Sequence, residues 1–148
     1  MVEATKNQTD VIEKLCDLMQ LDIDAVEAYE QAIKNIETSA IKQNITSFKE
    51  DHKRHITELS AQIISLGGTP PERSKDLKGF IIKGMTAIQS SLGENQALHA
   101  MKLNEKLTNK MYKNALEMSL PADVRELVEK NYADEKRHLS YINQQLDQ

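Results

Sequence analysis

Two short stretches of the sequence combine histidine with acidic residues at a spacing that suits metal binding. Glu135 and His138 lie in Asp-Glu-Lys-Arg-His near the end of the sequence, and His52 and His55 lie in Asp-His-Lys-Arg-His, 83 residues earlier. Residues three apart lie on one face of an α-helix, so a single ion could contact both members of a pair. If both stretches are helical and face each other, the middle of the protein contains a metal site.

The two stretches belong to a longer internal repeat. When the chain is shifted by 83 positions, its halves align without a gap, Asp22 falls on Glu105, and Tyr29 falls on Tyr112. Two amphipathic hairpins of similar composition could share matched leucines by chance. A common register of acid, tyrosine and Asp-x-Lys-Arg-His is better explained by a true repeat.

The same spacing fits antiparallel hairpins, in which residues at equal height are equidistant from the turn. The midpoint between Asp22 and either histidine of the first stretch lies next to residues 37–40, where the helical pattern weakens. The midpoint between Glu105 and the second stretch falls at Leu120-Pro121. These midpoints place both sets of residues mid-bundle. The predicted metal ligands are Asp22, His52, His55, Glu105, Glu135 and His138.

The elements that would position these residues are four long helices. Apolar residues recur at helical spacing over about 9–38, 41–66, 94–118 and 122–146. We expect residues 1–8 to be frayed, Thr9 to be the first N-cap, and Gly67-Gly68 to end the second helix. The predicted fold is all-α: one domain, 1–148, forming an antiparallel four-helix bundle of two hairpins. A connection of about 25 residues, with a short helix over 74–89, would cross the length of the bundle.

Composition excludes several other classes of protein. The chain has 148 residues and a net charge of −4 without a basic cluster, which argues against nucleic acid as a partner. No apolar run is long enough for a membrane span, and no secretory signal is visible, so we expect a cytoplasmic location. The single cysteine, Cys16, excludes an intrachain disulfide, and its place on an apolar stripe predicts a packing role.

The sequence resembles the ferritin-like, rubrerythrin-like di-iron carboxylate superfamily, and most closely its DUF2383 group. The resemblance rests on four segments, Tyr29 to Ile33, Asp51 to His55, Leu66 to Pro70 and Asp134 to His138. In that superfamily two helices each give a Glu and two others each give a Glu-x-x-His. The resemblance implies that Tyr29 and Tyr112 hydrogen-bond to ligating carboxylates.

The first half departs from this pattern. Asp22 stands where Glu is usual, and His52 stands where a bridging Glu is usual. The set therefore has three carboxylates and three histidines, and Glu135 alone keeps a natural bridging position. The nitrogen-rich group of Asp22, His52 and His55 would also suit zinc. We expect two ions of unequal affinity, or one ion only.

The neighbours of the ligands are expected to be less important. Asp51 and Asp134 are predicted to point away from the site, and the arginines and lysines of both stretches to form surface ion pairs. His99 is out of phase with Glu105 and is predicted to lie at the surface.

The leading functional hypothesis is a small redox protein that binds two transition-metal ions, iron first, with zinc or manganese as alternatives. The resemblance implies ferroxidase- or peroxidase-like chemistry on O2 or peroxide. Because no Cys-x-x-Cys pair exists, electrons would come from an external donor. Two alternatives stay open: a non-redox, zinc-type metal-binding protein, and a structural bundle with a vestigial site. The hairpins could also pair with a second copy, as a homodimer, through positions such as Ile81 and Ile82.

Overall fold

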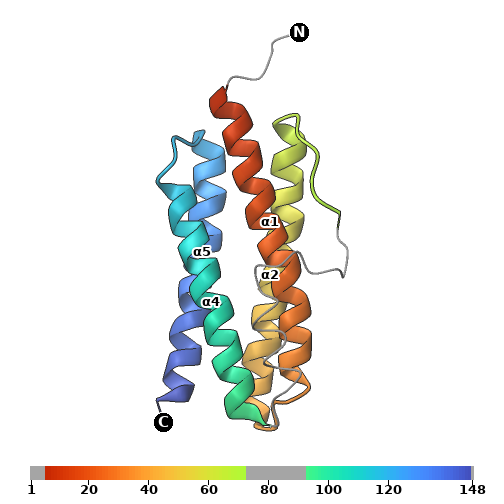
Figure 1. Ribbon diagram of the computed structural model, residues 1–148, viewed down its shortest axis with the longest axis vertical. Coiled ribbons are helices and arrows are strands. Elements are labelled where there is room, and N and C mark those ends of the chain that lie inside the picture. The colour runs from red at the N-terminus through yellow and green to blue at the C-terminus, as the bar shows by residue number, and fades with distance from the viewer. Residues whose placement is uncertain (1–5, 73–92, 148) are drawn as a thin grey trace.

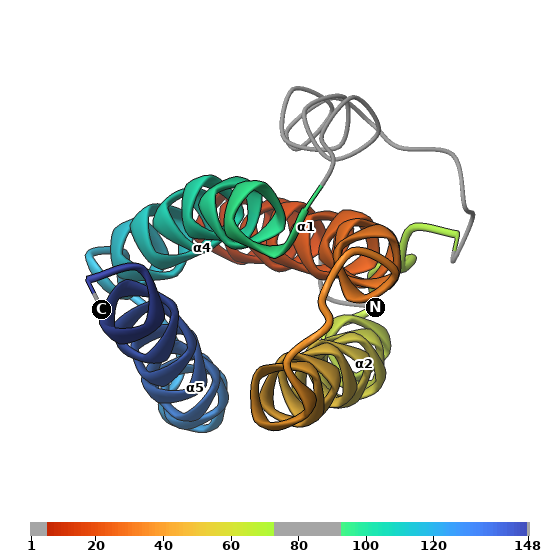
Figure 2. The same ribbon diagram turned by 90° about the horizontal axis from the view of Figure 1, so that it is seen from below.

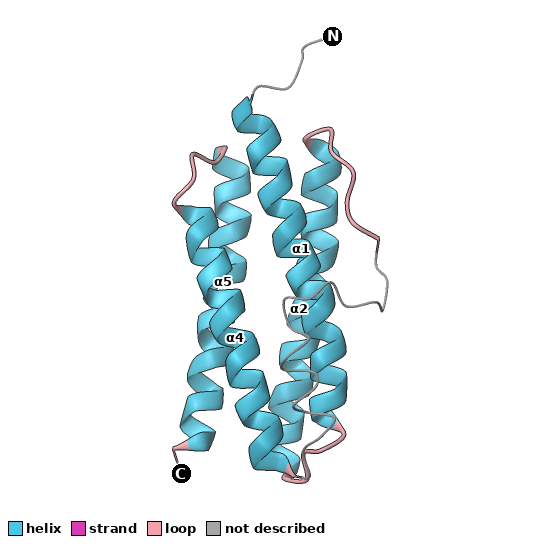
Figure 3. Ribbon diagram, viewed as in Figure 1, coloured by secondary structure: helices cyan, strands magenta, loops and turns pink. Residues whose placement is uncertain are grey.

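The computed structural model describes residues 6–72 and 93–147. The described chain forms four helices, α1 (Lys6–Ile33), α2 (Ser39–Ser65), α4 (Glu94–Leu116) and α5 (Ala122–Leu146), and contains no strand (Figure 1, Figure 3). The predicted all-α antiparallel bundle of two hairpins is confirmed. The short helix predicted over 74–89, and positions 81 and 82, lie outside the described residues.

The helices are ordered α4, α1, α2, α5 around the bundle axis (Figure 2). Helices α1 and α2 pack together as one hairpin, α4 and α5 pack together as the other, and α1 also lies against α4. The contact between α2 and α5 is the least extensive of the four. The two histidine-containing stretches lie on α2 and α5, so they face each other across this seam.

The ends of α1 differ from the prediction. Thr9 lies inside the helix, which already includes Lys6, so the predicted N-cap is wrong. The helix ends at Ile33, earlier than the predicted Thr38. The chain then makes a tight turn. The Asn35 N–H donates to the Ala32 carbonyl (2.9 Å), and the Ile36 N–H donates to the Ile33 carbonyl (3.2 Å). Ile36 thereby becomes buried at the end of the core.

The start of α2 is held by a residue from α4. The Glu94 carboxylate accepts the backbone N–H groups of Glu37 (3.0 Å) and Thr38 (2.7 Å), and also the Thr38 hydroxyl (2.9 Å). These donors precede the first turn of α2, so a carboxylate distant in sequence caps that helix. This contact ties the beginning of the second hairpin to the turn of the first.

The end of α2 follows the predicted glycine signal. Gly67 has a φ of 89°, and the Gly68 N–H donates to the Ile63 carbonyl at 2.9 Å. This left-handed conformation with a backward hydrogen bond is a common way to end a helix. At the other turn, α4 ends at Leu116 rather than at Met118, and Arg125 donates to the carbonyls of both residues.

Apolar side chains fill the bundle above and below a polar layer. Leu15, Leu18, Ile45, Met101 and Ile142 are among the fully buried residues of the core. Mid-bundle, the interior is instead charged and histidine-rich. Among the described helices, none has an apolar stretch that could cross a membrane.

Candidate metal centre

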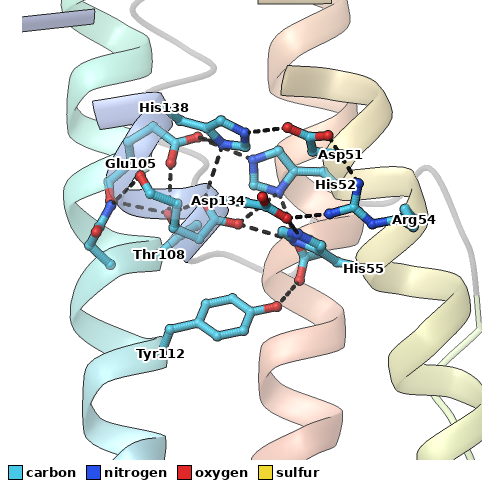
Figure 4. A network of polar contacts seen from close by, with 12 residues as sticks. Asp51, His52, Arg54, His55, Glu105, Thr108, Tyr112, Asp134 and His138 are labelled. Carbon is cyan, nitrogen blue, oxygen red and sulfur yellow. Dashed lines mark hydrogen bonds and ion pairs between the residues drawn. The ribbon is translucent and has the colours of Figure 1, made fainter. Parts of the chain in front are cut away.

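The six predicted ligands converge in the middle of the bundle, and all six are fully buried. Every described helix contributes at least one of them: α1 gives one residue, α2 gives two, α4 gives one and α5 gives two. Figure 4 shows the side chains of α2, α4 and α5 pointing toward one another. The residues brought together are Asp22, His52, His55, Glu105, Glu135 and His138.

These residues form two overlapping groups, each suited in composition to hold one ion. In each group the potential ligand atoms lie within 4.8 Å of one another. Both groups contain His52 and Glu135, the two equivalent positions of the internal repeat. The first group adds Asp22 and His55, and the second adds Glu105 and His138.

In the first group, Asp22 is the central carboxylate. Its Oδ1 lies 2.6 Å from Nδ1 of His52 and 3.1 Å from Nδ1 of His55. Its second oxygen accepts a hydrogen bond from the Tyr112 hydroxyl at 2.6 Å. A tyrosine of the other hairpin therefore fixes the orientation of this carboxylate.

The second group has the same organisation around Glu105. Glu105 Oε1 accepts a hydrogen bond from the Tyr29 hydroxyl and lies 3.1 Å from Nε2 of His52. Nδ1 of His138 lies 3.5 Å from the same oxygen. Each tyrosine thus reaches across the bundle to the acid of the other half, as the resemblance implied for their hydrogen bonding.

Thr108 also contacts the site, which the sequence analysis did not predict. Its hydroxyl lies 3.0 Å from Glu135 Oε2 and 3.2 Å from Glu105 Oε2, and can donate its one proton to either carboxylate. The equivalent position in the first half of the repeat is Ala25. Because the repeat does not preserve a polar group there, it could not have pointed to Thr108.

The prediction that Asp51 and Asp134 point away from the site is wrong. Asp51 on α2 accepts a hydrogen bond from Nε2 of His138 on α5 (2.8 Å), and Asp134 on α5 accepts one from Nε2 of His55 on α2 (2.9 Å). Each aspartate therefore crosses the seam to hold the histidine of the opposite stretch. The remaining ring nitrogen, Nδ1, is directed to the interior, which is the arrangement expected for a metal-binding histidine.

Two arginines complete this crossing pattern, and they form the ion pairs predicted for them at the surface. Arg54 contacts Asp51 (3.2 Å) and Asp134, while Arg137 contacts Asp51 (2.7 Å) and Asp134 (3.2 Å). Their side chains are 41% and 52% exposed, so the seam between α2 and α5 is closed by charges that reach solvent (Figure 4).

Buried charge shifts the pKa of every site histidine upward. Burial opposes protonation of His55, but the carboxylates of Asp22 and Asp134 outweigh it and raise its pKa to about 11. The pKa of His138 rises to about 10, because Asp51, Glu105 and Glu135 outweigh its burial. The pKa of His52 also rises well above its usual value.

The pKa values of the three central carboxyl groups shift in different directions. The surrounding imidazolium groups outweigh the cost of burial and hold the pKa values of Asp22 and Glu105 below their usual range. For Glu135, burial and the nearby Glu105 carboxylate raise the pKa instead. The protons on the histidines thus supply the positive charge that a cluster of buried carboxylates requires.

Two buried atoms of the cluster have the properties expected of metal ligands. Within the described chain, Glu135 Oε1 and His138 Nδ1 are buried without a hydrogen-bond partner. Glu135 Oε1 lies 3.2 Å and 3.4 Å from Nδ1 of His55 and of His52, close enough for ionic contact. Buried polar atoms are normally hydrogen-bonded or coordinated. Both atoms belong to the ligand set, and a mixed carboxylate and imidazole set suits iron, manganese or zinc.

Comparison with known proteins identifies the family of the chain and supports its fold. A family model described as a domain of unknown function, DUF2383, matches residues 10–118. The chain belongs to the DUF2383 family. The matched residues include α2, α4 and all but the first turn of α1, and therefore four of the six candidate ligands. Glu135 and His138, on α5, lie beyond the match.

One solved structure extends the comparison to this DUF2383 protein as a whole. It is described as a crystal structure of ferritin-like, diiron-carboxylate proteins from Bacillus anthracis str. Ames. The TM-score is 0.76, and the match covers 97% of this chain and 99% of that chain at 21% identity. The likeness shows that the DUF2383 bundle is ferritin-like. No curated protein matches the chain.

The site is a closed interior rather than an open cleft. A shallow groove of about 410 Å³ lies on the outer side of α4 and α5 and contains none of the six residues. It is lined by Asn109, Lys136 and Ser140, among others.

Proposed function

We propose that this protein binds two transition-metal ions, with iron as the first candidate, and uses them in redox chemistry of the ferroxidase or peroxidase type. The observation that carries the proposal is the pair of fully buried groups that share His52 and Glu135. The ferritin-like fold supports it, since such bundles commonly build metal sites from inward-facing residues.

Each part of the site has a definite role in this proposal. Asp22 and His55 would help to hold one ion, Glu105 and His138 would help to hold the other, and His52 and Glu135 belong to both groups of potential ligands. Bound iron would supply the electrons for reduction of O2 or peroxide. An external donor would restore those electrons, because the chain has one cysteine and no Cys-x-x-Cys pair.

The surrounding residues would prepare the ligands. Tyr29 and Tyr112 orient the two acids, and the outer aspartates hold Nε2 of His55 and His138 so that Nδ1 faces inward. Burial excludes water. Metal binding displaces the protons that the histidines carry in the metal-free protein, since only a neutral imidazole nitrogen can coordinate.

Elemental analysis of the purified protein, followed by anaerobic loading with Fe(II) and exposure to O2, tests the proposal. We expect up to two ions per chain and oxidation of Fe(II) faster than in buffer. Glu135→Ala should abolish this oxidation while the helical circular dichroism signal stays intact. Unchanged turnover in that variant would refute the assignment.

A non-redox role remains the second candidate, and the nitrogen-rich first group favours it. Two histidines and an aspartate are a ligand set that zinc accepts. Tightly bound zinc, together with no O2 consumption after iron loading, would establish this alternative. A protein that binds neither metal would instead have a vestigial site.

A further inference from the structure

His52 differs from the other two histidines of the cluster in the use of its ring nitrogens. For His55 and His138, Nδ1 faces the centre, while Nε2 is engaged by an outer aspartate. Both nitrogens of His52 face carboxylates of the cluster: Nδ1 lies 2.6 Å from Asp22 Oδ1, and Nε2 lies 3.1 Å from Glu105 Oε1. Its ring therefore separates the central acid of the first group from that of the second.

We propose that His52 bridges two bound ions, with Nδ1 on the ion held by Asp22 and His55 and Nε2 on the ion held by Glu105 and His138. This inference rests on the proposed metal binding. The internal repeat explains why the position can bridge, because His52 is equivalent to Glu135. A carboxylate there offers one oxygen to each side, and an imidazole ring offers one nitrogen to each side.

The charge of the ligand set favours such a bridge. Two divalent ions carry four positive charges, whereas the set has three carboxylates. When both ring nitrogens of His52 coordinate, both of its N–H protons leave to solvent and the ring becomes an anion. That anion supplies the fourth negative charge. Balance matters here because all six side chains are fully buried, and an uncompensated buried charge is costly.

The competing arrangement is a bridge formed by Glu135 alone, with His52 bound to one ion. Glu135 is suited to bridging too, since Oε1 faces His55 (3.2 Å) and Oε2 lies 3.6 Å from Nδ1 of His138. The two arrangements differ in the separation of the ions. A carboxylate bridge usually places them about 3.5–4 Å apart. An imidazole bridge places them about 6 Å apart, because two zinc–nitrogen bonds of about 2 Å extend outward from the ring.

A crystal structure of the zinc-loaded full chain, with anomalous scattering to locate zinc, tests the proposal directly. We expect two zinc positions, one beyond each nitrogen of the His52 ring. Two zinc ions bridged by Glu135, with His52 on one of them, would overturn the bridge while preserving metal binding. A single zinc position would overturn it as well. Absence of zinc from a folded crystal would also overturn the bridge, and failure of the same protein to bind Fe(II) would in addition remove the proposed function itself.

Zinc affinities of matched variants test the same bridge in solution. Loss of an outer partner costs roughly 10- to 100-fold in metal affinity. His52→Ala should lower the zinc affinity at both ion positions by more than this amount. His55→Ala and His138→Ala should each lower the affinity at one position by more than this amount and leave the other nearly unchanged. Native mass spectrometry and competition titration measure these changes. Weakening of one ion only in His52→Ala would contradict the bridge.

A second variant covers the case in which His52→Ala fails to fold. His52→Glu introduces the residue that occupies the equivalent position in the other half. The variant should still bind two ions, now about 3.5–4 Å apart as in carboxylate-bridged pairs. X-ray absorption spectroscopy should detect this metal–metal distance in the variant and not in the unmodified protein. The same short distance in both proteins would overturn the proposal.

Discussion

The two halves of the centre share their supporting contacts but differ in their ligands. In both halves a tyrosine reaches the opposite acid, an aspartate reaches the opposite histidine, and an arginine pairs with both aspartates. The candidate ligands are Asp22, His52 and His55 in one half and Glu105, Glu135 and His138 in the other. A symmetric frame thus supports an asymmetric ligand set. Variants of equivalent positions can separate what the frame contributes from what the ligands contribute.

The largest effect is expected when either central acid loses its charge. Asp22→Asn and Glu105→Gln each remove one buried negative charge that faces two histidines of the cluster, which should cost the metal-free protein about 3 kcal/mol or more. Urea unfolding in the presence of a chelator measures the loss. Equivalent losses would show that both halves depend on the same charge pairing. A loss in one variant alone would break the equivalence.

The pH dependence of the metal-free protein tests the protonated histidines. His55 and His138 have pKa values of about 11 and 10, above the usual 6.5 of an unfolded chain. Their stabilisation is complete below pH 6.5 and is lost as pH rises toward those values. The free energy of unfolding should fall by about 1.4 kcal/mol per pH unit for each histidine that stays protonated.

Urea unfolding between pH 6.5 and 9 gives this slope, and His55→Gln provides the control. The variant should show a shallower slope, because one protonated histidine is missing. A flat profile in the unmodified protein would mean that the histidines are neutral when the metal is absent.

Each outer aspartate should affect the affinity for one ion, the one bound by the histidine that it contacts on the opposite helix. Asp134→Asn weakens the support of His55, and Asp51→Asn weakens the support of His138. Each should lower zinc affinity at the corresponding ion by about 10- to 100-fold. Competition titration with a zinc-sensitive dye measures both. Equal weakening of both ions by either variant would contradict the assignment of each aspartate to one histidine.

The smallest effect is expected at the arginines. Arg54→Gln and Arg137→Gln remove partly exposed ion pairs, so each should cost at most about 1 kcal/mol. Thermal unfolding at low and high salt measures this cost, which salt should reduce. A loss of several kcal/mol would show that the seam between α2 and α5 depends on these arginines far more than their exposure suggests.

Much of this centre was predictable from the sequence because the candidate ligands occupy equivalent positions in the two halves of the repeat. The apolar period predicted four helices, and the equal spacing of acids and motifs predicted that six distant residues would meet. The direction of Asp51 and Asp134 could not be read in this way. A residue adjacent to a ligand lies about 100° away around its helix. Whether that direction meets solvent or a neighbouring histidine depends on how α2 and α5 pack.

The misplaced ends of α1 have a similar cause. A threonine before an apolar pattern is a good N-cap in isolation, yet the helix continues through Thr9. At the other end, the burial of Ile36 and the contact of Glu94 with the turn decide where the chain leaves the helix. Both the burial of Ile36 and the contact of Glu94 depend on parts of the chain that are distant in sequence, so the local pattern could not reveal them.

The reciprocal contacts across the seam have a consequence for the origin of the chain. Each hairpin provides a tyrosine for the acid of the other hairpin and an aspartate for its histidine. Two copies of a single hairpin could therefore assemble with the same pairing. Two copies of the α4–α5 hairpin would bring together four glutamates and two histidines, one Glu105, one Glu135 and one His138 from each. A duplicated and fused gene, followed by divergence that included positions 22 and 52, would produce a chain with this pairing.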